Sequence, residues 1–140
     1  FGSTGDDEFD ATDSMGKNRM SGGEGDDTFF LGMNDRALGG EGDDKFFVQF
    51  GGDNILSGGE GADQFWIADT ELPEAANTIV DFEIGTDVIG ILGSADLGID
   101  ASTLELNVVG GNTEIALGGD TLAIVTGVTG LDVDTSVVFA

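Results

Sequence analysis

The chain lacks cysteine, histidine and tyrosine, and among its 140 residues it has one proline and only four basic side chains. Without cysteine and histidine it cannot form a disulfide, the usual zinc or haem ligand sets, or a catalytic triad built on those residues. No apolar run approaches the ~20 residues that a membrane-spanning helix needs. Oxygen atoms are therefore the ligands that this chain can offer to a metal ion.

Acidic residues dominate the charge, because 28 Asp and Glu oppose four Lys and Arg and give a net charge of −24. Such a field repels phosphate backbones and anionic lipid, so nucleic acid and membrane surfaces are poor candidates as partners, whereas hard cations are attracted. The hydrophobic content of 39% is too high for a disordered acidic tail. The length fits one domain or two small ones. The first residue is not Met and lies inside a repeat, so we expect a fragment or a processed product.

A repeat of about nine residues runs through residues 1–67. Its strong copies share Gly at the fourth place, Asp at the sixth and Phe at the eighth, and they occupy residues 2–10, 22–30, 39–47 and 58–66. Weaker copies lie between them at residues 13–21, 31–38 and 50–57. The eighth place predicts inward-pointing anchors, which are Phe9, Phe29, Phe46 and Phe65 in the strong copies and Met20, Leu38 and Leu56 in the weak ones.

This period predicts a coil in which glycine-rich turns alternate with short strands. Glycine accepts positive φ and lets the chain turn sharply, and the three residues that follow form a strand whose middle side chain points inward. Two repeats make one coil of about eighteen residues, and successive coils stack as parallel strands about 4.8 Å apart. Alternate copies then lie on the same side, so the strong anchors form one column and the weak anchors another.

Stacked turns would place the four sixth-place aspartates above one another: Asp7, Asp27, Asp44 and Asp63. This arrangement is repulsive unless a cation lies between the turns, and calcium accepts six to eight oxygens from carboxylates and backbone carbonyls. Four turns enclose three gaps, so we predict three calcium sites. Asn18 and Asn54 are candidates for weaker sites in the other column, but Arg36 at the sixth place of the shortened copy argues against a full second row.

The motif G-G-x-G-x-D-x-U-x, in which U is a large apolar residue, resembles the repeat of RTX, or haemolysin-type, calcium-binding proteins over residues 2–66. The resemblance implies a parallel β-roll that is disordered without calcium and folds when calcium binds. A glycine-rich acidic linker would not fix Phe at the eighth place, and no stretch has the acid spacing of an EF-hand. The ligands implied are the four aspartates and the carbonyls of turn residues Ser3, Gly5, Gly23, Gly25, Gly40, Gly42, Gly59 and Gly61.

Residues 68–140 lose the period and are typical of separate strands, at 78–82, 87–92, 103–109, 113–117, 121–128 and 136–140. No long amphipathic helix is expected. The predicted fold class is all-β, with a calcium-binding parallel β-roll over residues 1–67 and a strand-rich C-terminal cap over residues 68–140. A cap of this kind is what a solenoid requires at its end.

Two further resemblances concern this second part. Residues 77–92 resemble the segment that ends many RTX rolls, which implies that Asp81 and Asp87 close the roll and contribute to its last turn. Residues 110–128 and the terminal VVFA resemble the C-terminal region of serralysin-type proteins exported by type I secretion. They imply a secreted protein, located outside the cell or on its surface.

A second large aromatic residue follows the anchor in three strong copies: Phe30, Phe47 and Trp66. Strand alternation points these side chains outward, where they would form an exposed stripe. One interpretation is that residues 68–140 fold back and cover the stripe. The other is that it contacts another protein or another copy of this chain.

Two functions fit these features, and neither is enzymatic, because the clustered aspartates are assigned to metal and no pattern indicates a catalytic cleft. The first is a calcium-binding extracellular module that folds after type I secretion and aids export, an attached domain or attachment to acidic glycans through calcium. The second is an extracellular structural subunit that self-assembles into a filament or surface layer through an open roll edge. Size distribution with and without calcium distinguishes them.

Overall fold

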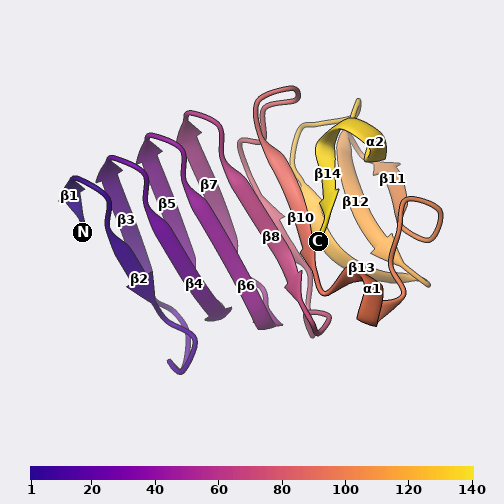
Figure 1. The fold of residues 1–140 in the computed structure, drawn as a ribbon, viewed down its shortest axis with the longest axis horizontal. Helices are drawn as coiled ribbons and strands as arrows, with labels where there is room; N and C mark the ends of the chain where they lie inside the picture. Colours follow the sequence, from indigo (N-terminus) through magenta and orange to yellow (C-terminus); the bar gives the residue numbers. More distant parts are fainter.

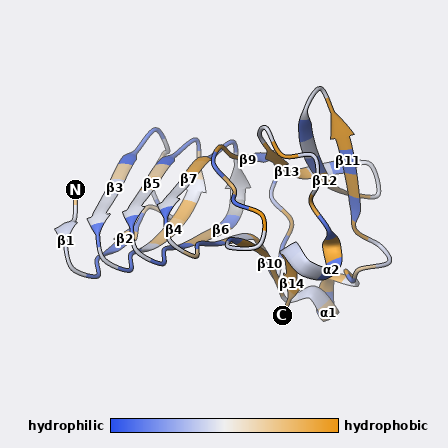
Figure 2. Ribbon diagram, turned by 90° about the horizontal axis from the view of Figure 1, so that it is seen from above, coloured by the Kyte–Doolittle hydropathy of each residue, from blue (hydrophilic) through white to orange (hydrophobic). Residues whose placement is uncertain are grey.

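The computed structural model describes the backbone of residues 1–140 and the side chains of all of them except Phe50. The chain winds as a flattened coil of about five turns between two facing sheets (Figures 1 and 2). Within the described backbone, sheet A has eight strands and sheet B has six. Helix accounts for about 6% of the chain. The prediction of an all-β fold with a parallel β-roll is confirmed.

Each coil contributes one strand to each sheet. Sheet A takes β1 (Ser3–Thr4), β3 (Arg19–Glu24), β5 (Arg36–Glu41), β7 (Ile55–Glu60) and β9 (Asn77–Ile79). Sheet B takes β2 (Glu8–Asp10), β4 (Thr28–Met33), β6 (Lys45–Gly52), β8 (Gln64–Asp69) and β10 (Val88–Leu92). All neighbouring pairs among these strands are parallel.

The turns from sheet A to sheet B depend on glycine. Gly25, Gly42 and Gly61 have φ values of 120°, 127° and 131°, which are costly for residues with a Cβ. A Cβ at Gly42 would also collide with the carbonyl oxygen of Gly25 in the preceding coil. The glycines of the repeat therefore allow both the sharp turn and the close stacking of coils.

The strong anchors form the predicted column in sheet B. Phe9, Phe29, Phe46 and Phe65 are cross-strand partners in sequence. Their rings stack with centroids 4.9, 4.8 and 5.0 Å apart, and the last three side chains are fully buried. Burying a phenylalanine side chain stabilises the fold by about 1.5–3 kcal/mol, so this column is a large part of the roll's core.

The weak column differs from the prediction at one position. Met20 pairs with Ala37 and Ala37 with Leu56, so the anchor of the shortened copy is Ala37. Leu38 lies on the outer face of sheet A with 48% of its surface exposed, and its assignment as an anchor was wrong. The reason is that Ala37 follows Asp35 by two residues, as Met20 follows Asn18 and Leu56 follows Asn54. That spacing from the polar turn residue sets the register more strongly than side-chain size.

The C-terminal strands extend both sheets beyond the end of the roll (Figure 1). Strand β13 (Asp120–Val125) pairs in parallel with β9 and continues into an antiparallel meander with β12 (Asn112–Leu117) and β11 (Glu105–Val109). Strand β14 (Val137–Phe139) pairs in parallel with β10. Parallel pairing therefore continues through β9 and β10, past residue 67, and the domain boundary placed there stays a prediction.

Helices α1 (Ser94–Leu97) and α2 (Val133–Ser136) have four residues each. Among the residues described, neither helix has the length to cross a bilayer.

The outward aromatic residues form a ladder on sheet B, as the alternation predicted. Phe30 stacks on Phe47 at 5.3 Å and Phe47 on Trp66 at 6.1 Å between ring centroids, and all three are partly buried. The ring of Trp66 also lies over Gly90, its partner in the next coil. The C-terminal strands lie beyond the end of the roll rather than across this face (Figure 1). The use of this ladder as a partner contact stays a prediction.

Candidate metal centre

The sixth-place aspartates form a hydrogen-bonded ladder at the edge where the chain turns from sheet A to sheet B. The backbone N–H of each donates to Oδ1 of the aspartate in the next coil. The distances are 2.8 Å for Asp7 to Asp27, 2.8 Å for Asp27 to Asp44, 2.9 Å for Asp44 to Asp63 and 3.0 Å for Asp63 to Asp87. One oxygen of each accepting carboxylate is thereby fixed in place.

In the four strong copies, the second oxygen of the sixth-place carboxylate has no protein partner. The Oδ2 atoms of Asp7, Asp27, Asp44 and Asp63 are all buried without a hydrogen bond. Buried polar atoms in folded proteins almost always have a partner, and an unpaired buried charge is especially costly. A row of such atoms at one edge indicates that a positively charged ligand belongs beside them.

The first-place glycine of each strong turn lets Oδ2 pack directly against the backbone, because it has no Cβ. A Cβ at Gly39 would collide with Oδ2 of Asp44 and with the carbonyl oxygen of Gly58 in the next coil. Gly22 has the same relation to Asp27 and to the Gly39 carbonyl. Three turns therefore bring a carboxylate oxygen and a carbonyl oxygen of the following coil into one small space, beside Gly2, Gly22 and Gly39.

The fourth turn ends this pattern. The nearest neighbours of Gly58 all belong to Asp63, and the next coil presents Asp81 in place of a glycine turn. Asp81 accepts from the Ser57 hydroxyl at 2.7 Å and from the N–H groups of Gly58 and Gly59 at 2.9 and 3.0 Å. Asp87 likewise uses both oxygens, since Oδ2 accepts from the Glu83 N–H at 2.8 Å. These bonds suit residues that close the roll, and a metal-binding role for either stays a prediction.

The donor set at this edge fits calcium. In the part of the chain that the structure describes, no three acidic side chains converge on a common point. The edge instead combines single carboxylates with backbone carbonyls, a mixture that calcium accepts and zinc does not favour. The predicted turn residues, from Ser3 to Gly61, do have the positive φ expected of them. The carbonyls beside Oδ2, however, belong to first-place residues Gly22, Gly39 and Gly58, which the motif had not singled out.

Burial and mutual repulsion raise the pKa values of carboxyl groups in this ladder. Burial, together with repulsion from the neighbouring carboxylates of Asp63 and Asp27, raises the pKa of Asp44 to about 7 despite the hydrogen bond from the Asp27 N–H. Burial likewise raises the pKa of Asp63 to about 6, with Asp87 and Asp81 as repelling neighbours. The pKa values of Asp27 and Asp87 are also raised, again chiefly by burial. A divalent cation would oppose all of these shifts.

An exposed ladder of fifth-place residues runs beside the buried one, and sequence reasoning missed it. The N–H of Asp26 donates to Asp6 at 2.9 Å, that of Asp43 to Asp26 at 2.8 Å and that of Ala62 to Asp43 at 2.8 Å, each time to Oδ1. The available signal was the first Asp of the repeated GDD triplet. These carboxylates strengthen the negative potential at the same edge.

The opposite edge carries a ladder of a different composition. The N–H of Asn18 donates to Asp35 at 3.0 Å, that of Asp35 to Asn54 at 2.8 Å and that of Asn54 to Asn77 at 3.2 Å. Placing Arg36 at the sixth position was wrong, because Asp35 occupies that position and Arg36 follows it. The amide of Asn54 also donates to the Gly32 carbonyl at 3.0 Å, whereas Oδ2 of Asp35 is buried without a partner. Metal binding by Asn18 and Asn54 stays a prediction.

Comparison with known proteins identifies the repeat. Residues 1–33, 12–46 and 31–65 match the family model of the RTX calcium-binding nonapeptide repeat. Among solved structures, the solution structure of the AlgE6R3 subunit of the mannuronan C5-epimerase from Azotobacter vinelandii is similar, with 28% identity and a TM-score of 0.50. That match covers all of this chain and 81% of the other. No curated protein matches the chain.

Proposed function

Because this chain is an RTX-repeat protein, we propose that it is a non-catalytic module whose β-roll folds when calcium binds at the aspartate edge. The observation that carries the proposal is the row of buried, unpartnered Oδ2 atoms, each packed against a first-place glycine whose lack of a Cβ lets the carboxylate lie there. Without a cation these atoms oppose folding, and with one they favour it. Calcium binding would thereby supply folding free energy.

Three ions are the number that the geometry favours. Each would lie between two coils, held by Oδ2 of the first coil's aspartate and by turn carbonyls, with Asp7, Asp27 and Asp44 supplying the carboxylates. The ion would supply charge neutralisation and cross-link neighbouring coils. The protein's own part is to fix Oδ1 of Asp27 and of Asp44 through the ladder, which leaves their Oδ2 atoms for the ion.

We propose that this calcium-dependent folding takes place on export from the cell. Inside cells calcium is scarce and the roll would stay unfolded, whereas sites of extracellular modules bind at about 0.1–1 mM. A ligand at 100 times its dissociation constant stabilises the folded state by about 2.7 kcal/mol per independent site. The resemblance of residues 110–128 and the C-terminus to type I secreted proteins supports this setting.

The partner that we propose is an acidic glycan. The similar solved structure is a subunit of an enzyme named for mannuronan, a polymer of an acidic sugar. The RTX repeat family that this chain matches is not catalytic, which supports a binding role rather than a catalytic role for this chain.

Calcium titration of the metal-free protein tests the proposed folding. Circular dichroism should report the β-structure, and emission of Trp66, which is partly buried against Phe47, should shift to shorter wavelength on folding. Chelation with EGTA should erase both signals. Magnesium should restore them poorly, because it demands near-octahedral geometry and loses its water ligands reluctantly. The amount of bound calcium should approach three ions per chain. Full β-structure in metal-free buffer at pH 8 would refute the proposal.

A self-assembling structural subunit is the second candidate. Strands β1 and β2 are edge strands of the two sheets, and unpaired backbone groups on such edges can accept another strand. Calcium-dependent polymers in sedimentation velocity would favour this candidate. A monomer at all calcium concentrations would favour the binding module.

A further inference from the structure

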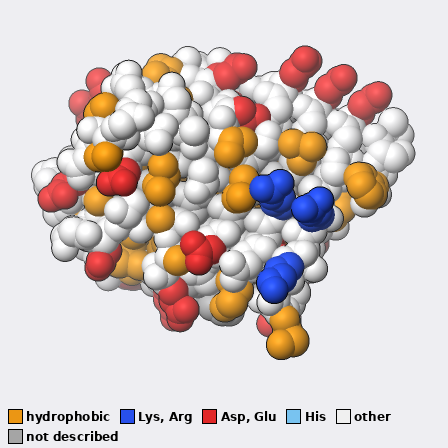
Figure 3. Space-filling view, turned by 180° about the vertical axis from the view of Figure 1, so that it is seen from behind, with side chains coloured by type: hydrophobic (Ala, Val, Ile, Leu, Met, Phe, Trp, Pro, Cys, Tyr) orange, Lys and Arg blue, Asp and Glu red, His pale blue; other side chains and the backbone are white. Residues whose placement is uncertain are grey.

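Three of the four basic residues gather on the outer face of sheet A. Arg19 and Arg36 are cross-strand partners, and Lys17 precedes Arg19 by two residues. Figure 3 shows basic side chains grouped on this face, with acidic ones along the rim. The fourth, Lys45, begins β6 in the other sheet. In a chain with a net charge of −24, this grouping concentrates three of the four basic side chains on one face.

These cations are not used to neutralise the protein's own acids. Within the described side chains, neither arginine nor Lys17 forms an ion pair with a carboxylate. Asp53 lines an adjoining hollow together with Lys17 and the two arginines. With 28 acidic residues in the chain, unpaired arginines side by side remain available to an external anion.

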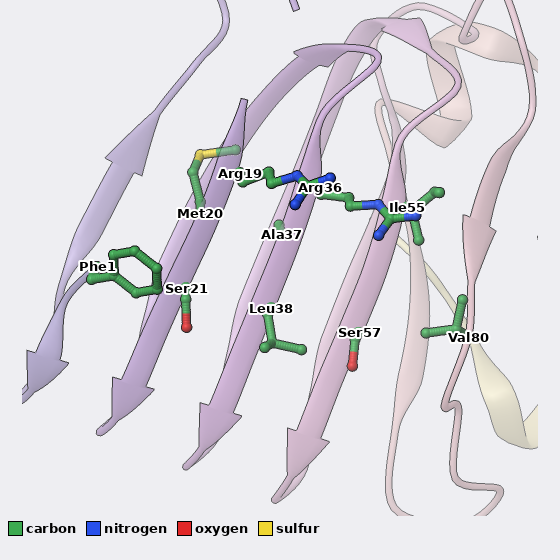
Figure 4. A pocket seen from close by; sticks show the side chains of 10 residues that line it. All are labelled: Phe1, Arg19, Met20, Ser21, Arg36, Ala37, Leu38, Ile55, Ser57 and Val80. Carbon is green, nitrogen blue, oxygen red and sulfur yellow. The ribbon is translucent and has the colours of Figure 1, made fainter. Parts of the chain in front are cut away.

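The arginines form one side of a groove of about 520 Å³. Two residues further along the strands, Ser21, Leu38 and Ser57 form the next cross-strand row, and Val80 lies at its end (Figure 4). Leu38 and Val80 are 48% and 43% exposed. The surface thus combines charge, hydroxyl groups and exposed apolar side chains, and it lies on the sheet face rather than at the aspartate edge.

We propose that this groove binds a uronate oligosaccharide segment of an acidic polysaccharide. Arg19 and Arg36 would each bind a carboxylate, because the planar guanidinium matches carboxylate geometry and can donate two hydrogen bonds. Leu38 and Val80 would pack against the apolar faces of sugar rings, and the serines would bond to ring hydroxyls. This inference rests on the glycan partner of the proposed function, but it needs no bridging calcium.

A second copy of the chain suits the groove less well. Two chains of net charge −24 repel each other strongly, whereas a short oligosaccharide carries few charges. The groove volume also lies in the range of sites that take small ligands. The spacing between strands, about 4.8 Å, is close to the length of one pyranose unit, so adjacent arginines can meet adjacent sugars.

The test uses the calcium-loaded chain, with folding verified by Trp66 emission. Mannuronate and galacturonate tetramers are titrated by calorimetry, with maltotetraose as the neutral probe. The Arg19→Gln/Arg36→Gln double variant should bind the uronates at least tenfold more weakly. Lys45→Gln, which removes a charge from the other sheet, should bind within twofold of the parent, and maltotetraose should not bind detectably.

Three results would overturn the inference. A folded, calcium-loaded parent that binds neither uronate would do so, as would equal weakening by the Lys45→Gln and double variants. The third is concentration-dependent dimerisation that the double variant abolishes while uronates stay unbound, which would assign the face to a second copy. Failure to fold with calcium would instead refute the proposed function, so the two failures are distinguishable.

Discussion

The backbone N–H of Asp44 donates to Oδ1 of Asp63 at 2.9 Å, while Oδ2 of each residue is buried with no hydrogen bond. The same bond that orders the ladder holds the two carboxylates close enough to repel each other, and this repulsion contributes to the raised pKa of Asp44. The ladder is therefore a structure that needs either protons or a cation. This dependence leads to separate tests at the two edges of the roll.

The first prediction compares the two ladders. Asp44→Ala removes a carboxylate that we assign to calcium and leaves the buried N–H of Asp27 without an acceptor, which alone costs about 1–3 kcal/mol. Asn18→Ala removes amide bonds to Ser14 and Asp35 near the end of the other ladder, and we expect a loss of about 1 kcal/mol. Calcium midpoints followed by circular dichroism should rise several-fold for Asp44→Ala and much less for Asn18→Ala. Equal shifts would contradict the assignment of calcium to one edge.

The second prediction concerns the space beside a first-place glycine. Gly39 is not among the residues with positive φ, so its φ suits alanine, but the added Cβ would collide with Asp44 Oδ2 and with the Gly58 carbonyl oxygen and displace the carboxylate. Gly39→Ala should lose about one bound calcium per chain in equilibrium dialysis. Gly130→Ala is the matched control, because a Cβ there meets only Ile84, at 3.6 Å. An unchanged calcium count in Gly39→Ala would mean that the ion binds elsewhere.

The strong repeats could be predicted from sequence because their register is repeated four times. Phe29, Phe46 and Phe65 lie two residues after an aspartate in every strong copy, and the structure stacks them as expected. The weak copies lack this redundancy. Ala37 is small, so a size-based anchor selected Leu38, and the error moved the sixth place from Asp35 to Arg36.

Other features could not be derived from the repeat because they depend on contacts between distant segments. Asp81 bonds to the turn at Gly58 and Gly59, 23 and 22 residues earlier, and no local pattern specifies that pairing. The groove beside Arg19 and Arg36 likewise can be recognised only when the strand register is known, because Leu38 lines it only if its side chain points outward.

The third prediction tests whether the second ladder works without metal. The side-chain N–H of Asn54 donates to the Gly32 carbonyl at 3.0 Å. The equivalent atom of Asp35, Oδ2, has no hydrogen to donate and is buried without a partner. Asp35→Asn would supply a donor of the same shape and remove a buried negative charge. We expect an unchanged calcium count and a melting temperature equal to or higher than that of the parent. Loss of one calcium ion would instead show that Asp35 is a ligand.

The fourth prediction is the pH dependence of the metal-free chain. The pKa of Asp44 is raised to about 7 and that of Asp63 to about 6, above the value near 3.9 of an unfolded aspartate. The folded roll therefore binds more protons than the unfolded chain between about pH 4 and 7, so its stability falls as pH rises through that window. In resin-treated, metal-free buffer, β-structure should be greater at pH 5 than at pH 8.

Calcium should reverse this trend, because protons compete with the ion for the same carboxylates. The calcium midpoint for folding should increase as pH falls from 8 to 5. Asp44→Asn serves as the control, because the asparagine amide does not titrate. In metal-free buffer this variant should show a weaker pH dependence of folding, while the other acidic residues still titrate. Metal-free β-structure that increases with pH would contradict the raised pKa of the buried ladder, and with it the reason that these stacked turns need a cation at neutral pH.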